Sequence, residues 1–324
     1  MLEVHLASKR VSVRRAPVPR VPRGYARIRM LVAGICSTDL ELQRGYYGFS
    51  GTPGHEFAGE VVAVNGSTEE ESAWLGQRVA GEINLACGRC EWCSRGLGRH
   101  CPHRTVLGIV EHPGAFREFL TLPIRNLHRI PDGLPDERAV FIEPVAAACE
   151  ILDQVKIKMD DRVAVLGDGK LGLLVAQVLA AHGAQVHLYG RHRDKMRLVE
   201  GPGITTEAVP KKLPERKWPM VVDATGSAEG LRSAVRMCVP RGIVVMKSTV
   251  HGLVPIDTAP AIVNEITLIG SRCGRFEPAI RLLSSGRVRV DAFISEEYTL
   301  DRAAHAFRRA ATTGVLKVLL RPPR

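Results

Sequence analysis

The chain has 324 residues, of which 45% are hydrophobic, a size and composition typical of a globular protein with two domains. Its net charge of +11 comes from scattered Lys and Arg, and with only five Tyr and three Trp the sequence disfavours nucleic-acid binding. No apolar run approaches the roughly 20 residues of a membrane span, and the N-terminus lacks the apolar core of a signal peptide. We expect a cytoplasmic protein without nucleic-acid or membrane partners, whose basic surface and pocket suit an anionic cofactor.

The first part of the chain is predicted to be rich in β-structure. Residues 26–32 alternate between apolar and polar side chains as a half-buried strand should, and turns around Pro and Gly precede them. Further strands are expected over 57–64 and 77–80. Together these segments predict a barrel-like β-domain.

A candidate metal site lies between the first two predicted strands. Cys36, His55 and Glu56 supply a thiolate, an imidazole and a carboxylate, a mixture that Zn²⁺ favours, and a catalytic zinc has few protein ligands so that one position stays open. Asp39 is close enough in sequence to orient a ligating histidine. Taken singly, each Cys or His would be read as a buried core residue; as a group they favour a metal.

A second candidate metal site follows in one short segment. Its cysteines, separated by two, two and seven residues, can surround a tetrahedral ion and leave no open position, which indicates a structural zinc. An iron–sulfur cluster is the alternative, but the last gap is longer than the bacterial ferredoxin pattern has. The ligands are Cys87, Cys90, Cys93 and Cys101.

A third motif is typical of dinucleotide binding. A β-branched strand at 162–166 precedes three glycines, and apolar residues at helical spacing follow. The glycines permit a tight turn, close approach of the pyrophosphate and close packing of the helix, whose N-terminus faces the phosphates. The predicted coenzyme residues of the motif are Gly167, Gly169, Lys170, Leu171 and Gly172.

These motifs, in this order, resemble the zinc-dependent branch of the medium-chain dehydrogenase/reductase superfamily, which includes alcohol, polyol and threonine dehydrogenases. The resemblance implies an α/β protein with a GroES-like catalytic domain at 1–146 and a Rossmann domain at 147–279. It also implies a return to the first domain at 280–324. Two zinc ions per chain, one catalytic and one structural, and a homodimer or homotetramer are further implications.

The resemblance also assigns residues to the catalytic zinc and to proton transfer. Glu143, in a Glu-Pro pair, matches a carboxylate placed at the zinc in polyol and threonine dehydrogenases, although it could simply begin a helix. Whether Glu56, Glu143 or water completes the zinc sphere stays open. Thr38 matches the hydroxyl that passes on the substrate proton, or is an ordinary loop hydroxyl. Glu41 stands where many relatives have a relay histidine.

The end of the second Rossmann strand, 185–189, bears on coenzyme choice. An acidic residue that binds the adenosine ribose normally stands there, but this chain has Gly190 followed by Arg191 and His192. Loss of the carboxylate removes repulsion against a 2′-phosphate, and a guanidinium can grip that group. We therefore predict NADP(H) over NAD(H). Lys195 adds charge there but discriminates little.

The remaining coenzyme candidates lie at later strand ends. Strands are expected over 220–223, 243–246 and 266–269, and Thr225 and Lys247 follow the first two, where open α/β sheets bind ligands.

Two further segments are read from the pattern and the resemblance. Residues 201–217, with little periodicity, are expected to be a surface excursion. Gly314–Leu320 resembles the closing strand of the family. Lys317 there matches a basic residue near the pyrophosphate, or is an exposed strand lysine.

The sequence thus predicts hydride transfer between an alcohol or carbonyl substrate and a nicotinamide coenzyme, with zinc binding the substrate oxygen. The substrate is a small molecule of unassigned identity, such as a polyol, a sugar, an amino alcohol or a simple alcohol. The alternative is a dinucleotide-binding zinc protein without efficient turnover, which acts as a redox-sensing or partner-binding module.

Overall fold

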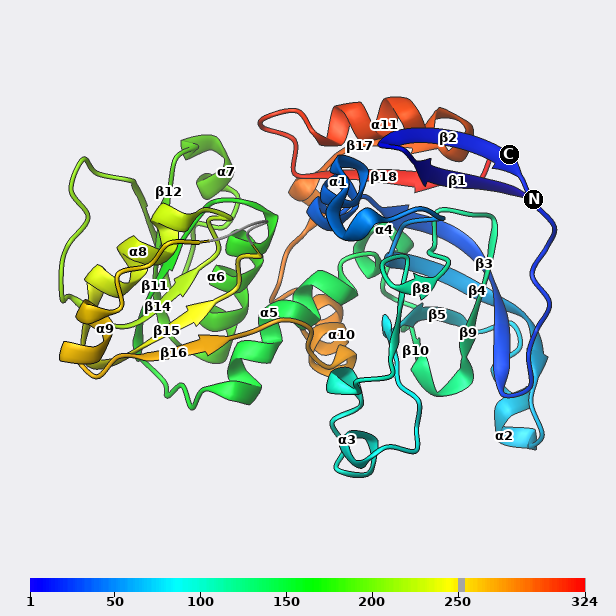
Figure 1. Ribbon diagram of the computed structural model, residues 1–324, viewed down its shortest axis with the longest axis horizontal. Coiled ribbons are helices and arrows are strands. Elements are labelled where there is room, and N and C mark those ends of the chain that lie inside the picture. Colours follow the sequence, from blue (N-terminus) through cyan, green and yellow to red (C-terminus); the bar gives the residue numbers. More distant parts are fainter. Residues whose placement is uncertain (250–253, 324) are drawn as a thin grey trace. The chain divides into compact units, whose positions relative to one another are not determined.

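A computed structural model describes residues 1–249 and 254–323, and the chain divides into two compact units (Figure 1). Unit 1 contains Met1–Glu143 and Ile294–Arg324, and unit 2 is Pro144–Phe293. Unit 1 is therefore built from the two ends of the chain. None of the helices in the described residues is long and apolar enough to cross a bilayer.

The centre of unit 1 is a seven-stranded sheet with the order β10-β5-β4-β3-β18-β17, in which β9 also pairs with β3. A hairpin of β1 and β2 and a small sheet of β6, β7 and β8 accompany it. The strands are β1 (Leu2–Ala7), β2 (Arg10–Arg15), β3 (Tyr25–Gly34), β4 (Glu56–Asn65), β5 (Arg78–Gly81), β6 (Asn84–Leu85), β7 (Thr105–Leu107), β8 (Glu111–His112), β9 (Phe119–Pro123), β10 (Leu127–Arg129), β17 (Ile294–Thr299) and β18 (Lys317–Arg321).

The predicted strands of this domain are confirmed, and β3 shows why they form. Ala26, Ile28 and Met30 are fully buried, while Arg29 between them is exposed, so the alternation read from the sequence matches the two faces of the sheet. The C-terminal strand β18 lies antiparallel to β3 and parallel to β17. The end of the chain therefore completes the sheet that its beginning starts.

Short helices connect these strands in unit 1. They are α1 (Ser37–Arg44), α2 (Glu69–Ser72), α3 (Glu91–Ser94), α4 (Asp136–Ala139) and α11 (Ala303–Ala310). The helix α5 (Ile142–Gln154) begins with the last two residues of unit 1.

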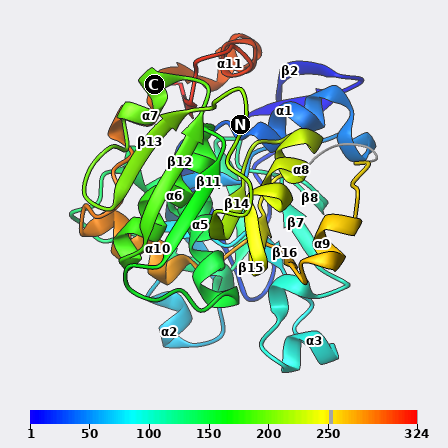
Figure 2. The ribbon, with the colours of Figure 1, turned by 90° about the vertical axis from the view of Figure 1, so that its left-hand side faces the viewer.

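Unit 2 contains a six-stranded parallel sheet, whose strands lie side by side in the order β13-β12-β11-β14-β15-β16 (Figure 2). This is the strand order of a Rossmann fold, so the predicted fold class is confirmed. The strands are β11 (Arg162–Leu166), β12 (Gln185–Gly190), β13 (Ile204–Ala208), β14 (Trp218–Asp223), β15 (Cys238–Met246) and β16 (Thr267–Gly270).

Helices cover both faces of the Rossmann sheet, with α6 on one side and α8 and α9 on the other (Figure 1). The helix α6 begins within the glycine motif, at Lys170, and has eight buried residues, as a helix packed on a sheet requires. The helices of this unit after α5 are α6 (Lys170–His182), α7 (Arg193–Arg197), α8 (Ala228–Met237), α9 (Ala259–Val263) and α10 (Phe276–Ser284).

The expectation that 201–217 is only a surface excursion is wrong. Ile204–Ala208 forms β13, which pairs with β12 at the edge of the sheet. None of its residues is fully buried, so the segment lacks the apolar run or alternation that marks a strand in a sequence.

The domain boundaries were predicted after residues 146 and 279, whereas the compact units meet after 143 and 293. The helix α10 accounts for the second difference, because it belongs to unit 2 and buries Phe276, Ala279 and Leu283.

Candidate metal and coenzyme sites

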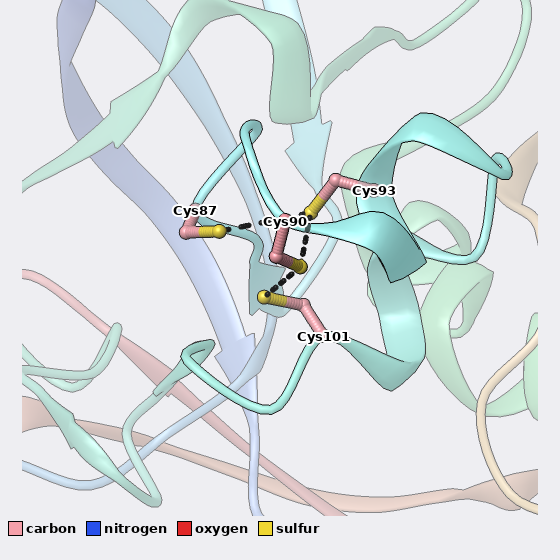
Figure 3. Close-up of side chains that lie close together, drawn as sticks. All are labelled: Cys87, Cys90, Cys93 and Cys101. Atoms are coloured by element: carbon pink, nitrogen blue, oxygen red, sulfur yellow. Dashed lines mark hydrogen bonds between the residues drawn. The ribbon is translucent and has the colours of Figure 1, made fainter.

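The four cysteines of the predicted structural zinc site converge on one point (Figure 3). Their Sγ atoms lie 3.5 Å (Cys90 to Cys93), 3.6 Å (Cys90 to Cys101) and 3.9 Å (Cys87 to Cys93) apart. Four sulfurs at the Zn–S distance around a tetrahedral ion would be separated by about 3.8 Å. The residues present therefore fit zinc.

The backbone around these cysteines also favours thiolates. The backbone N–H of Arg89 donates a hydrogen bond to the Cys87 sulfur and lowers the pKa of that thiol. The backbone N–H of Cys93 likewise favours the Cys90 thiolate, but burial and the neighbouring thiols outweigh it and raise the pKa of Cys90 to about 11. The segment 87–101 therefore supplies all four candidate ligands and also the backbone N–H groups that donate to their sulfur atoms.

The second candidate centre brings together two segments of unit 1, one before α1 and one at the start of β4. Cys36 precedes α1, while His55 and Glu56 stand at the start of β4, and the ligand atoms of all three lie within 4.8 Å of one another. His55 and Glu56 are 3% and 1% exposed. A thiolate, an imidazole and a carboxylate in one buried cluster are a donor set that fits zinc.

Asp39 ties the two parts of this cluster together. Its carboxylate is fully buried and accepts hydrogen bonds from the backbone N–H groups of Cys36 (2.8 Å) and Gly54 (3.1 Å). It also lies 3.5 Å from Nδ1 of His55, an ion-pair distance rather than a hydrogen bond. Asp39 is thus positioned to orient the histidine, as the sequence suggested.

The charges around His55 compete. Burial opposes the protonated ring, but the negative charges of Asp39 and Cys36 outweigh it, so the pKa of His55 lies well above its ordinary value. A bound cation would be stabilised by the same negative surroundings.

Glu56 also pairs with a lysine from the C-terminal part of the chain. The Nζ of Lys317, on β18, donates to Oε2 of Glu56, and both side chains are almost completely buried. The ammonium also lies 5.3 Å from the centre of the Phe141 ring. Gly34 makes room for the pair, since a Cβ there would lie 2.9 Å from Glu56 Oε2 and 3.1 Å from Lys317 Cδ.

The alternative that Lys317 is an exposed strand lysine is wrong, because the residue is 1% exposed. Burial disfavours its charged form, but the carboxylate of Glu56 more than compensates and raises the pKa of Lys317. Its predicted contact with the coenzyme stays a prediction.

Glu143 is not among the three residues that cluster here. It is half-buried in the first turn of α5, where the helix dipole favours a carboxylate, and the candidate ligands that lie together are Cys36, His55 and Glu56. Its role as a zinc ligand remains a prediction.

Of the two proton-transfer candidates, Thr38 lies beside the cluster and Glu41 lies at the surface. The Cys36 Sγ is 3.8 Å from the Thr38 hydroxyl. Glu41 forms an ion pair with Arg44 and its side chain is 39% exposed. No interaction between Thr38 and Glu41 occurs within the described residues.

The glycine motif of unit 2 has the geometry expected of a phosphate-binding turn. Gly167 has a φ of 110°, and a Cβ on Gly172 would lie 2.0 Å from the Gly167 carbonyl oxygen. Gly169 caps α6, and a Cβ there would meet nothing within 4 Å. Open space at a helix N-terminus is where a pyrophosphate can approach the backbone.

Asp168, in the glycine loop, lies against the end of β12, and the sequence did not point to it. The Asp168 carboxylate accepts hydrogen bonds from the backbone N–H groups of Arg191 and His192 and from Nδ1 of His192. A Cβ on Gly190 would lie 2.6 Å from Asp168 Cβ and 2.9 Å from its Cγ. A carboxylate therefore does lie at this strand end, although it comes from the glycine loop.

The other coenzyme candidates have different surroundings. Thr225, after β14, donates its hydroxyl to Asp223 Oδ1 (2.7 Å). Lys247, after β15, is 7% exposed, and its Nζ donates to the carbonyl oxygens of Ala147 (2.6 Å) and Arg272 (2.9 Å). Lys195 is half-buried on α7. Their contacts with a coenzyme stay predictions.

Comparison with known proteins identifies the family. Residues 22–132 match the alcohol dehydrogenase GroES-like domain, and residues 171–285 match the zinc-binding dehydrogenase family. This chain belongs to the zinc-dependent medium-chain dehydrogenase/reductase superfamily. The predicted GroES-like and Rossmann architecture is confirmed with it.

Relatives of this chain extend over nearly all of it. A sorbitol dehydrogenase from Halalkalibacterium halodurans is 27% identical over 96% of this chain and 95% of its own length. A zinc-binding dehydrogenase from Sinorhizobium meliloti, solved with NADP, is 29% identical with a TM-score of 0.88 over 99% of both chains. An alcohol dehydrogenase from Thermus sp. ATN1 is 28% identical with a TM-score of 0.87 over 100% of both.

Proposed function

We propose that this medium-chain dehydrogenase transfers a hydride reversibly between a CH–OH carbon of a small molecule and the nicotinamide ring of a bound dinucleotide. The observation that carries the proposal is the buried cluster of Cys36, His55 and Glu56 in a chain that also has the Rossmann glycine motif. Cys36 and His55 would hold a zinc ion there, which would supply Lewis acidity toward the substrate oxygen. Cys87, Cys90, Cys93 and Cys101 would hold the second, structural ion.

The side chains of the cluster have separate tasks in this proposal. Cys36 and His55 are ligands, and Asp39 orients His55. Glu56, paired with Lys317, is a carboxylate that would balance the charge of the metal, and Glu56, Glu143 or water would complete its sphere. Thr38 is the candidate that passes on the substrate proton, and Glu41, which has no direct contact with Thr38 in the part of the chain that the structure describes, is the candidate for proton exchange with solvent.

The substrate class is proposed from the relatives. One relative is the sorbitol dehydrogenase described above. Another is a D-arabitol-phosphate dehydrogenase from Enterococcus avium, which is 26% identical over 94% of this chain, and both are named after a polyol or its phosphate. We propose a polyol or sugar alcohol as the substrate.

We also propose a preference for NADP(H). It is supported by Gly190 at the end of β12 and by Arg191, whose exposed side chain can contact a 2′-phosphate. The NADP bound by the Sinorhizobium meliloti relative is consistent with it.

Two properties of the molecule complete the proposal. A homodimer or homotetramer is supported by the edge strand β16 and the nearby side chains of Ile262 and Val263, which are 71% and 77% exposed. A cytoplasmic location is supported by eight cysteines that are all free thiols.

The test is a substrate screen with both coenzymes. The zinc-loaded protein is assayed with NAD(H) and NADP(H) in parallel against polyols, sugar phosphates, threonine, simple alcohols, aldehydes and ketones. We expect turnover of a polyol or its ketone with NADP(H), and a loss of at least about a hundredfold in kcat for Cys36→Ser. Zinc in the four-cysteine site only, with no oxidation of NADPH across the panel, would instead support the binding module without turnover.

A further inference from the structure

We propose that Asp168 is a positioning residue for coenzyme selection, which holds His192 and the turn after β12 so that the imidazole can bind the 2′-phosphate of NADP(H). The inference rests on the proposed NADP(H) preference and names a residue that the glycine motif does not require. All the groups involved lie in unit 2.

Three N–H groups surround one oxygen of the Asp168 carboxylate. Two consecutive backbone N–H groups, of Arg191 (2.9 Å) and His192 (2.5 Å), donate to Oδ2, and so does the ring Nδ1–H of His192 (2.9 Å). The Asp168 residue is 7% exposed. Three donors satisfy this buried carboxylate oxygen and fix the turn in one conformation.

The same contacts determine which edge of the His192 ring can meet a ligand. The bond to Asp168 occupies Nδ1, so the ring keeps its Nε2 edge for other partners. Within the described residues Nε2 has no hydrogen-bond partner, and the His192 side chain is 42% exposed. When the ring carries both protons, Nε2–H is a donor for a phosphate oxygen at the end of β12.

Gly190 and Asp168 depend on each other. A side chain at 190 would begin 2.6 Å from Asp168 Cβ and 2.6 Å from Met196 Sδ. The usual acidic residue at this strand end therefore cannot coexist with Asp168 in its present place. With glycine at position 190, no side chain there can bind the ribose. Asp168 instead accepts hydrogen bonds from the next two residues, Arg191 and His192.

The local charge supports binding of an anion despite the carboxylate. Arg191, Arg193 and Lys195 lie on or next to the turn, so three basic side chains outnumber the carboxylates of Asp168 and Asp194. Because the charge of Asp168 is already engaged by three N–H groups, it stabilises the turn more than it repels a phosphate.

The test is coenzyme binding in the absence of substrate, measured by NADPH and NADH fluorescence titration of the full-length zinc-loaded protein. Asp168→Asn keeps an oxygen for the backbone N–H groups, whereas Ala would free them as new phosphate donors. We expect Asp168→Asn to raise the Kd for NADPH about tenfold and leave that for NADH within twofold. In a His192→Ala background the same change should have little further effect.

The control is Asp194→Asn, which removes a nearby exposed carboxylate that does not contact His192. If charge alone mattered, both Asn variants would strengthen NADPH binding, so weaker binding in Asp168→Asn alone supports the proposal. A selective rise in the Kd for NADH would mean that Asp168 binds the ribose hydroxyls directly, and would overturn it. Equal weakening of both coenzymes, or no change, would also overturn it.

These outcomes separate the inference from the proposed function. A wild-type protein that binds NADPH but turns over no substrate contradicts the oxidoreductase proposal and leaves the Asp168 comparison intact. A wild-type protein that prefers NADH contradicts the coenzyme preference before any variant is made.

Discussion

Glu56 and Lys317 bring opposite charges together at two positions that are each 1% exposed. Removing one partner of a buried pair leaves the other charged group without compensation, which is far more costly than losing an exposed pair. The pair also links β18, near the C-terminal end of the chain, to the candidate metal site of Cys36, His55 and Glu56.

We expect Lys317→Met to lower the free energy of unfolding of the metal-free, chelator-treated protein by about 3–5 kcal/mol, because no metal ion then compensates Glu56. Glu56→Gln in the same chain should recover part of that loss, because no isolated carboxylate then remains. Urea denaturation of both single variants and the double variant measures this coupling. Arg44→Gln, which breaks the exposed pair with Glu41, is the control and should cost less than about 1 kcal/mol. An additive double variant would contradict the expectation.

Contacts between distant residues explain what the sequence could not reveal at this scale. Asp168 meets His192 across 24 positions, and Lys317 meets Glu56 across 261. Neither spacing carries a local pattern, so the role of Asp168 was missed and the burial of Lys317 was not foreseen. Cys36, His55 and Glu56 could be grouped because their chemistry, rather than their spacing, pointed to one ion.

Among the elements, the start of α6 has two glycines with different functions, one at its N-cap and one in its first turn. At 172 the absence of a side chain permits backbone packing within the protein, since a Cβ would lie 2.0 Å from the Gly167 carbonyl oxygen. At 169 the surrounding space is open and the backbone is in an ordinary extended conformation. The two positions should therefore respond differently to alanine.

We expect Gly169→Ala to leave the melting temperature within about 2 °C of the wild type, while its methyl group raises the Kd for NADPH roughly tenfold. Gly172→Ala should lower the stability by about 1–3 kcal/mol, because the helix must move away from the turn. Thermal unfolding and fluorescence titration measure the two effects. Equal destabilisation by both substitutions would show that position 169 is also needed for packing.

Secondary structure was predictable where one face of an element is buried. The alternation in β3 and the apolar helical spacing of α6 could both be read from the sequence. The edge strand β13 could not, since its residues are all partly exposed and no burial pattern marks it.

Across the whole molecule, the described residues include two separate groups that could each hold a metal ion, which predicts two zinc ions per chain. We expect metal analysis of the purified protein to give two zinc per chain and no iron. Cys101→Ser should reduce this to one, because Cys101 closes the four-sulfur site. Cys149→Ala, which removes a buried cysteine outside both groups, should retain two. One zinc in the wild type, or iron in place of zinc, would contradict the prediction.

The interrupted construction of unit 1 has a consequence for how the protein is made. Residues 144–293 form a complete unit while the ribosome has yet to synthesise β18, which fills the position between β3 and β17. Until Lys317 emerges, Glu56 has no cation to neutralise it and the central sheet of unit 1 lacks an inner strand. We expect the coenzyme-binding unit to fold during translation, and the group of Cys36, His55 and Glu56 to reach its final arrangement only after β18 has left the ribosome.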